Sequence, residues 1–163
     1  MNTNLIGNRE IFGIEYLALT VSPPPPYGHC RIWLEGMFLG DIKETNYLTS
    51  TCSSLEGLAK YKDRFVLAAQ FVSLSDIELF NLFESGETTK DYGFLYIEGY
   101  DAFNSYAYYK QNHLYFLWQL APELKGEKHY QHLPQDLCSA KILLSIYEGV
   151  VNEFKRSLSN LIG

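Results

Sequence analysis

Residues 92–118 have the sequence YGFLYIEGYDAFNSYAYYKQNHLYFLW, in which 11 of 27 residues are aromatic. The aromatic residues form three short runs, separated by turn-forming residues at Gly99-Tyr100-Asp101 and at Gln111-Asn112. Aromatic side chains favour a half-buried pleated surface, where cross-strand aromatic pairs contribute up to about 1 kcal/mol each. The stretch therefore predicts an antiparallel β-meander, around which the rest of the chain is organised.

The last of these runs has two distinct faces. Because side chains alternate along a strand, one face carries Leu114, Phe116, Trp118 and Leu120, and the other carries His113, Tyr115, Leu117 and Gln119. The first face is apolar and is predicted to be core. The second is amphipathic, which suits a surface that lies either under a helix or against a partner.

The segment before the meander predicts strands first and helices second. Residues 10–21 are rich in β-branched and aromatic types and predict a long strand with a bulge at Gly13. Four prolines at residues 23–26 predict an exposed polyproline II connection, and residues 29–35 and 37–42 predict a hairpin around Glu35-Gly36.

Helical periodicity begins after residue 42. Apolar residues recur every three or four positions from Leu48 to Ala59, which predicts a helix of about four turns, and residues 64–71 are ambiguous between helix and strand. Ser75 and Glu78 have the spacing of a capping box, so a short helix is expected to begin near Ser75 and to end by Gly86.

Beyond the meander, residues 122–126 predict a turn, residues 130–133 an edge strand, and residues 136–161 a long helix that is interrupted or bent near Gly149. The chain as a whole is expected to form one α+β domain over residues 1–163. Its antiparallel sheet combines the N-terminal hairpins with the aromatic meander, and two or three helices pack on it.

The composition excludes several classes of protein. The chain has 163 residues and a net charge of −6, which argues against a nucleic-acid binder because such proteins carry a basic face. No apolar run approaches the length of a membrane span, and the N-terminus lacks the pattern of a signal peptide. Three cysteines without a CxxC pair are typical of reduced thiols, so we expect a cytoplasmic protein.

No catalytic motif is present among the usual phosphate-loop, dinucleotide, nucleophile-elbow and zinc-protease patterns. His129 and His132, with Glu127 nearby, would lie on opposite faces of a strand and are interpreted as solvated side chains. His29 and Cys30 would likewise point to opposite faces, which favours an inert buried thiol. We therefore expect no catalytic residue, no metal site and no cofactor.

One charge distribution points to an interaction surface. Seven acids and the single base Lys90 lie between residues 76 and 101, and the last five acids lie close in sequence to three tyrosines. An acidic rim around exposed tyrosines suits a basic protein partner, because the charges steer the encounter and the rings supply contact area. The candidate surface comprises Glu84, Glu87, Asp91, Tyr92, Tyr96, Glu98, Tyr100 and Asp101.

Two segments of the sequence carry a family resemblance. They are IGNREIFGIEY at residues 6–16 and RIWLEGMFLGD at residues 31–41, and both resemble immunity protein 42, a family found beside polymorphic toxins. The resemblance covers the first 42 residues, where Gly7, Glu15, Trp33, Gly36, Gly40 and Asp41 are its signature residues. The four-proline connection between these two segments departs from the family pattern.

The resemblance implies a non-enzymatic cytoplasmic protein that binds and neutralises a cognate toxin domain by occluding its site. It implies no catalytic residues, and the signature residues are at least as suited to shaping the first sheet as to touching toxin. The residues alone leave two alternatives open. One is a small-molecule-binding or enzymatic α+β domain that uses an aromatic cleft in the meander, and the other is a scaffold recognised through residues 23–26.

Overall fold

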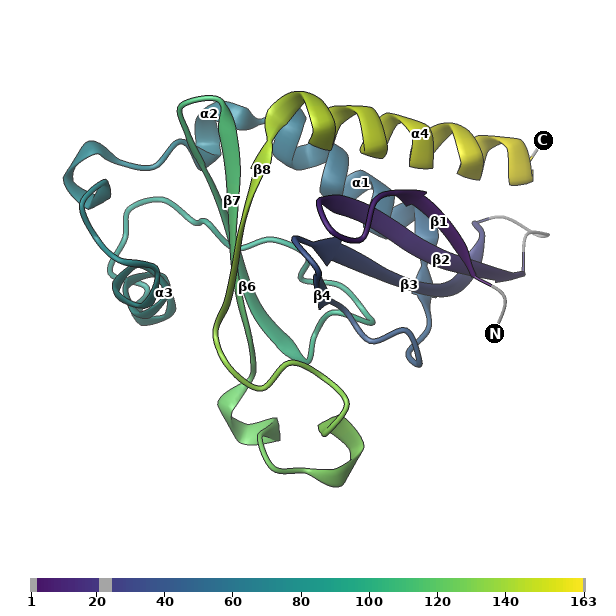
Figure 1. The fold of residues 1–163 in the computed structure, drawn as a ribbon, viewed down its shortest axis with the longest axis horizontal. Coiled ribbons are helices and arrows are strands. Elements are labelled where there is room, and N and C mark those ends of the chain that lie inside the picture. Colours follow the sequence, from purple (N-terminus) through teal and green to yellow (C-terminus); the bar gives the residue numbers. More distant parts are fainter. Residues whose placement is uncertain (1–2, 21–24, 163) are drawn as a thin grey trace.

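A computed structural model describes residues 3–20 and 25–162 and shows two antiparallel sheets with helices packed against them (Figure 1). The first sheet has the order β1-β2-β3-β4. The strand β5 pairs with the beginning of β3, at Tyr27 and Gly28, whereas β4 pairs with the end of β3. Its strands are β1 (Asn4–Gly7), β2 (Phe12–Thr20), β3 (Tyr27–Leu34), β4 (Met37–Leu39) and β5 (Asn46–Tyr47). The second sheet has the order β6-β7-β8, formed by β6 (Phe103–Lys110), β7 (His113–Leu120) and β8 (Cys138–Leu143).

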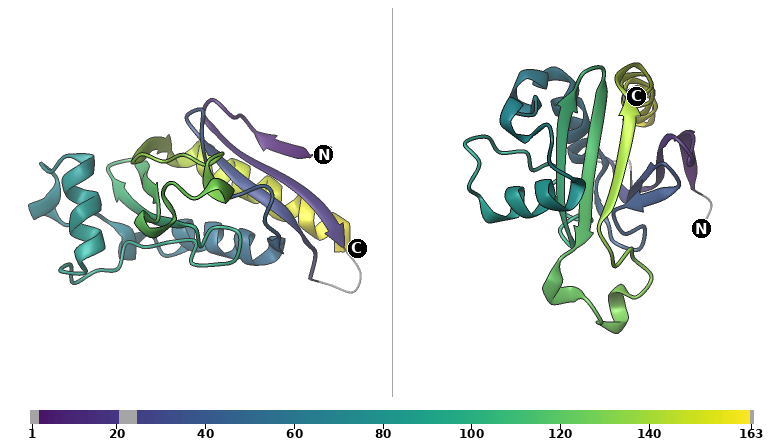
Figure 2. Two further views of the ribbon diagram at one scale, coloured as in Figure 1. Left: turned by 90° about the horizontal axis from the view of Figure 1, so that it is seen from below. Right: turned by 60° about the vertical axis from the view of Figure 1, so that its left-hand side comes forward.

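Within the described residues, four α-helices accompany the sheets, namely α1 (Leu48–Lys60), α2 (Lys62–Phe65), α3 (Asp76–Ser85) and α4 (Leu144–Ile162). Short 3-10 turns lie at Ala69–Phe71, Pro122–Leu124 and Lys128–Tyr130. Helix α4 runs directly on from β8 and lies beside α1 along the first sheet, whereas α3 lies on the far side of the second sheet (Figures 1 and 2). The predicted α+β class is confirmed.

The main core lies where the two sheets and the helices α1 and α4 meet. Trp118 of β7 is fully buried, and its indole N–H donates to the backbone oxygen of Phe38 in β4 at 3.0 Å. Tyr147 of α4 is also fully buried, and its hydroxyl donates to the backbone oxygen of Leu55 in α1 at 2.7 Å. These two contacts connect the second sheet to the first and one helix to the other.

The second face of β7 lies under helix α3, which resolves the alternative left open by the sequence. Leu117 packs in a smaller apolar cluster with Phe80 and Phe83 of α3. Tyr106 and Tyr108 of β6 join the same cluster, with the Phe83 ring 5.4 Å and 6.2 Å from theirs. Most of the meander's aromatic side chains therefore serve as core on one side of the sheet or the other.

Several local predictions are confirmed. Residues 113–120 alternate as expected, and the turn at Gln111-Asn112 joins β6 to β7. Helix α1 buries Leu48, Cys52, Leu55 and Leu58, as its periodicity predicts. Helix α3 begins with a complete capping box at Ser75 and Glu78 and ends at Gly86, whose φ is +69°.

The first aromatic run is not a strand, contrary to prediction. Gly93 makes a single bridge to Tyr106, and Leu95 has a φ of +56°, which interrupts an extended backbone. Residues 92–96 instead run beside β6, where the Phe94 N–H donates to the Ser105 oxygen at 3.2 Å. The third strand of this sheet is β8, from a part of the chain that was predicted to be helix.

Other boundary predictions are wrong as well. The C-terminal helix begins at Leu144 and continues through Gly149, and residues 130–133 form a turn rather than an edge strand. Gly13 lies in regular register opposite Trp33, and the irregularity of β2 falls between Ala18 and Thr20. The ambiguous residues 64–71 form the end of α2 and a 3-10 turn. The predicted polyproline connection at residues 23–26 lies partly outside the described residues.

Candidate interaction surface

Two adjoining hollows, of about 270 Å³ and 280 Å³, lie between helix α1 and residues 93–98. They share Ile97, so we treat them as one feature, the tyrosine groove. The groove is lined by Asn46, Tyr47, Ser50, Ser54, Gly57, Leu58, Tyr61, Arg64 and Phe65 on one side and by residues 93–98 on the other.

Helical periodicity explains the α1 side of the groove. The apolar stripe of α1 faces the core, which leaves Ser50, Ser54 and Gly57 on a different face at spacings of three and four residues. Tyr47 precedes this helix and Tyr61 follows it, and each of the two tyrosines is 48% exposed. The groove thus has a wall of small residues with an accessible aromatic ring at each end.

Tyr96 supplies the most exposed aromatic ring of the opposite wall, at 66% exposure. Its hydroxyl lies over Gly93, where an added Cβ would be 1.5 Å from the tyrosine oxygen, so a side chain at this position would displace the Tyr96 ring. Leu95 turns inward at positive φ and is buried. The irregular backbone of this segment therefore presents Tyr96 outward and anchors its neighbours inward.

Two carboxylates give the Tyr96 end of the groove a negative field. Partial burial, together with the charges of Asp91 and Glu84, raises the pKa of the Tyr96 hydroxyl. Asp91 accepts a hydrogen bond from the Gly93 N–H at 2.8 Å, and Glu84 accepts one from Asn104 at 2.9 Å. Tyr96 therefore remains a neutral donor at physiological pH, beside fixed negative charge.

The structure brings together only part of the predicted acidic surface. The carboxylates Glu84, Glu87, Asp91, Glu98 and Asp101 are all exposed, as is Tyr96, and Glu98 lines the groove. The predicted exposure of Tyr92 and Tyr100 is wrong.

Tyr92 and Tyr100 are both buried, for different reasons. The Tyr92 ring stacks on Phe83 at 4.5 Å, and its hydroxyl donates to the Val66 oxygen at 3.3 Å. The Tyr100 ring lies on Gly40, whose φ is +97° and where a Cβ would approach the ring to 2.6 Å. Tyr47 and Tyr61, which flank α1, replace them as accessible rings and were missed, although their position at the ends of a strongly periodic helix was a usable signal.

Two of the signature residues, Glu15 and Trp33, belong to a polar network in the first sheet. This carboxylate is 4% exposed and accepts hydrogen bonds from the Trp33 indole at 2.7 Å, the Thr3 hydroxyl at 2.7 Å and the Arg31 guanidinium at 3.0 Å. Burial alone would raise the pKa of Glu15, but the hydrogen bonds and the charge of Arg31 lower it overall. Glu15 and Trp33 therefore shape the first sheet rather than the groove.

Replacing Glu15 with glutamine is expected to lower the free energy of unfolding by about 2 kcal/mol at neutral pH, because it leaves the partly buried Arg31 without a counter-charge. The pKa of Glu15 is depressed in the folded state. Its contribution is therefore present above the ordinary value of 4.5 and is lost as the pH falls through the folded-state pKa. Urea unfolding at several pH values measures both effects.

Glu10→Gln is the matched control for this variant, because Glu10 is an exposed carboxylate in the same hairpin. Its free energy of unfolding should stay within about 0.5 kcal/mol of the unmodified protein. An equal loss in the two variants would contradict a special role for the Glu15 network.

The paired His29 and Cys30 do not form a catalytic couple. Burial raises the pKa of the Cys30 thiol to about 12, so the thiolate nucleophile is scarce at neutral pH. His29 lies across from the Glu44 backbone oxygen, with its Nδ1 2.9 Å away. The interpretation of Cys30 as a buried thiol agrees with its exposure of 0%.

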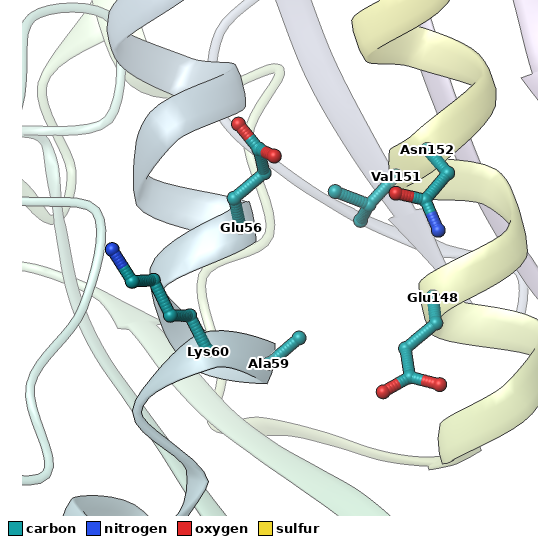
Figure 3. Close-up of a pocket in the computed structure, with 6 residues that line it drawn as sticks. All are labelled: Glu56, Ala59, Lys60, Glu148, Val151 and Asn152. Atoms are coloured by element: carbon teal, nitrogen blue, oxygen red, sulfur yellow. The ribbon is translucent and has the colours of Figure 1, made fainter.

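A further hollow of about 340 Å³ lies between α1 and α4 (Figure 3). Its lining residues are Glu56, Ala59 and Lys60 from α1 and Glu148, Val151 and Asn152 from α4, and the Lys60 side chain points away from α4. None of these six described residues is aromatic. The hollow therefore does not correspond to the aromatic cleft of the small-molecule alternative.

No helix among the described residues is long and apolar enough to span a membrane.

Comparison with known proteins assigns the chain to a family. Among curated protein sequences, none matches the chain. Among solved structures, CdiI from Burkholderia dolosa is similar, with a TM-score of 0.59 over 94% of this chain and 99% of that chain, at 12% sequence identity. At that identity the likeness supports the fold. The family pattern described as immunity protein 42 matches residues 1–157, far beyond the first two hairpins, and the chain therefore belongs to the immunity protein 42 family of toxin-neutralising proteins.

Proposed function

We propose that the protein neutralises its cognate toxin domain by binding it directly through the tyrosine groove and the exposed acids Glu84, Glu87, Asp91, Glu98 and Asp101, its acidic border. Binding there occludes the toxin's site without catalysis. The observation that carries this assignment of the surface is the clustering of three accessible tyrosines, Tyr47, Tyr61 and Tyr96, around one concave feature. Tyrosine is enriched among the residues that dominate binding energy at protein interfaces, particularly where rings enter a desolvated centre.

The charge of the groove suits a basic partner. The protein carries a net charge of −6, and Glu84 and Asp91 act directly on Tyr96. Among the charged side chains that line the groove, Arg64 lines the hollow that contains Tyr96 and Glu98 lines the adjoining one. The negative charge near Tyr96 therefore comes from Asp91 and Glu84, which lie beside the lining residues. Complementary charge accelerates association and excludes like-charged partners.

We infer that the protein acts in the cytoplasm. Cys30, Cys52 and Cys138 are all free thiols, and all three are buried. Reduced cysteines of this kind fit a compartment in which thiols are kept reduced. The assignment also agrees with a protein that meets its toxin inside the cell it protects.

The direct test is a calorimetric titration of the purified protein against the C-terminal toxin domain encoded by the adjoining upstream gene, at two salt concentrations. Stoichiometric binding that weakens at the higher salt concentration is the expected result, because surface charges are screened within about 10 Å at 0.1 M salt. An absence of heat at micromolar concentrations would overturn toxin binding. Tight binding without any salt dependence would overturn the electrostatic part alone.

Reversing the charges of Glu87, Glu98 and Asp101 to lysine tests the acidic border. These three side chains are exposed and make no side-chain hydrogen bond within the described part of the chain, so the fold should survive. We expect the association rate at low salt to fall about tenfold or more, because electrostatic steering is lost. Stopped-flow kinetics at low and high salt measures the effect.

The matched control reverses Glu123, Glu148 and Glu153, which are also exposed but lie outside the groove. Both triple variants change the net charge by the same amount, so a general charge effect would slow association equally in the two. Equal rates would place the toxin contact elsewhere.

A further inference from the structure

Four side chains capable of binding a metal meet between the β4–β5 connection and the β7–β8 connection, although they come from distant parts of the sequence. Asp41 and Glu44 lie in the connection between β4 and β5, and His129 and His132 lie in the connection between β7 and β8. The sequence prediction placed these histidines on opposite faces of a strand. They instead lie in and just after a 3-10 turn, Lys128–Tyr130, so both can face the same two acids.

The spacing of the ligand atoms suits one small divalent ion. One ligand atom each of Asp41, Glu44 and His129 lies within 4.8 Å of the others. The His129 Nε2 is 3.4 Å from the Glu44 Oε1. Metal–ligand bonds of 2.0–2.2 Å place neighbouring ligands of a tetrahedral site about 3.3 Å apart. The three groups therefore need only small side-chain adjustments to share an ion.

Asp41 is built into this position before any ion binds. It is 2% exposed, and its Oδ1 accepts the Lys43 N–H at 2.9 Å. The His132 Nε2 lies 3.0 Å from both carboxylate oxygens, so it fixes the plane of the carboxylate. Groups that orient a ligand in this way commonly raise metal affinity by 10–100-fold.

The backbone around the two acids is also fixed. The Glu44 backbone N–H donates to the Asp41 backbone oxygen at 3.0 Å. This bond closes a turn that brings both carboxylates to one side. The Asp41 N–H donates to the Gly99 oxygen at 3.1 Å. In contrast, the Glu44 and His129 side chains are 50% and 59% exposed, which leaves the site open to an entering ion.

We propose that Asp41, Glu44 and His129 bind a divalent transition-metal ion, with His132 positioning the Asp41 carboxylate. The mixed nitrogen and oxygen ligands favour Zn²⁺ or a similar ion over Mg²⁺ or Ca²⁺, which prefer oxygen ligands alone. The bound ion would fasten the long β7–β8 connection to the first sheet. This site is separate from the proposed toxin-binding function and does not depend on it.

The alternative is a purely ionic arrangement, in which His129 pairs with Glu44 and His132 pairs with Asp41 without a metal. Both arrangements predict the same contacts in the metal-free protein. Only metal binding distinguishes them, because it requires Glu44 and His129 to act on one ion rather than on each other.

The test titrates Zn²⁺ into chelator-treated full-length protein by calorimetry, with thermal unfolding followed in parallel. One equivalent is expected to bind and to raise Tm, since an ion that binds the folded state stabilises it. His129→Gln and Glu44→Gln should each weaken Zn²⁺ binding about tenfold or more. Both residues are largely exposed, so circular dichroism should show an unchanged fold.

His113→Gln and Glu127→Gln are the control variants, because they remove a histidine and an acid outside the proposed ligand set. They should bind Zn²⁺ as the unmodified protein does. The proposal is overturned if the unmodified protein shows no saturable binding, or if His129→Gln and Glu44→Gln bind Zn²⁺ as tightly as the controls.

Discussion

The double variant Tyr61→Ala, Tyr96→Ala is expected to bind the toxin domain about 150-fold more weakly than the unmodified protein, a loss of about 3 kcal/mol. The two rings line the same hollow from opposite walls, one following α1 and the other in residues 93–98. Tyr96 is 66% exposed and Tyr61 is 48% exposed, so both have area left to bury against a partner. Calorimetry or competition binding measures the change.

The fold should not be affected by this double variant, since neither ring belongs to the buried clusters. A control for lost apolar surface is Val72→Ala, Ile77→Ala, which truncates two exposed side chains in and just before α3. It should leave toxin affinity within a few-fold of the unmodified protein. If the control variant loses as much affinity as the tyrosine variant, the interface is not confined to the groove and extends over α3.

Tyr96→Phe separates the ring from its hydroxyl. The pKa of this hydroxyl is raised by partial burial and by Asp91 and Glu84, so it is protonated and available to donate a hydrogen bond to the toxin. Binding by Tyr96→Phe that matches the unmodified protein would assign the contribution to ring contact alone.

Local signals in the sequence predict those elements whose stability is local. The capping box at Ser75 and Glu78, the left-handed Gly86 and the period of α1 each act within a few residues, and all three appear where expected. The alternation of β7 is equally local, because one face of eight residues is apolar throughout.

The errors occur where tertiary context overrides a weak pattern. In β8, Cys138, Ala140 and Ile142 are buried in alternation, but the segment joins α4 so directly that its apolar residues also fit a helical period. Period alone does not separate a short strand from the first turns of a helix. Pairing with β7 determines that this segment is a strand, and the sequence of the segment itself does not predict that pairing.

The candidate surface is only partly predictable for the same reason. The sequence shows that residues 84–101 are acidic and tyrosine-rich, but not which rings face inward. Tyr100 is buried because Gly40 gives it space from 60 positions away in the chain. The approach of His132 to Asp41 spans 91 positions and has no local signal at all.

Replacing Trp118 with alanine is expected to lower the free energy of unfolding by about 4 kcal/mol, the largest effect on stability proposed for this protein. Trp118 is fully buried in the core where the two sheets meet, so alanine leaves a cavity that the surrounding strands cannot close. The change also removes the indole N–H that donates to the Phe38 oxygen at 3.0 Å. Domains of this size have about 5–15 kcal/mol of stability in total, so the loss removes at least about a quarter of it.

Trp118→Phe separates the two contributions, because it retains an aromatic ring and removes only the donor and part of the volume. Its free energy of unfolding should fall by about 2 kcal/mol, between the unmodified protein and Trp118→Ala. Urea unfolding monitored by circular dichroism measures both variants. A single transition with an unchanged m-value is expected, since residues of both sheets pack with α1 and α4 in one continuous buried core. Two separated transitions in the unmodified protein would contradict that coupling, and a loss below about 1 kcal/mol in Trp118→Ala would show that the core closes around the missing ring.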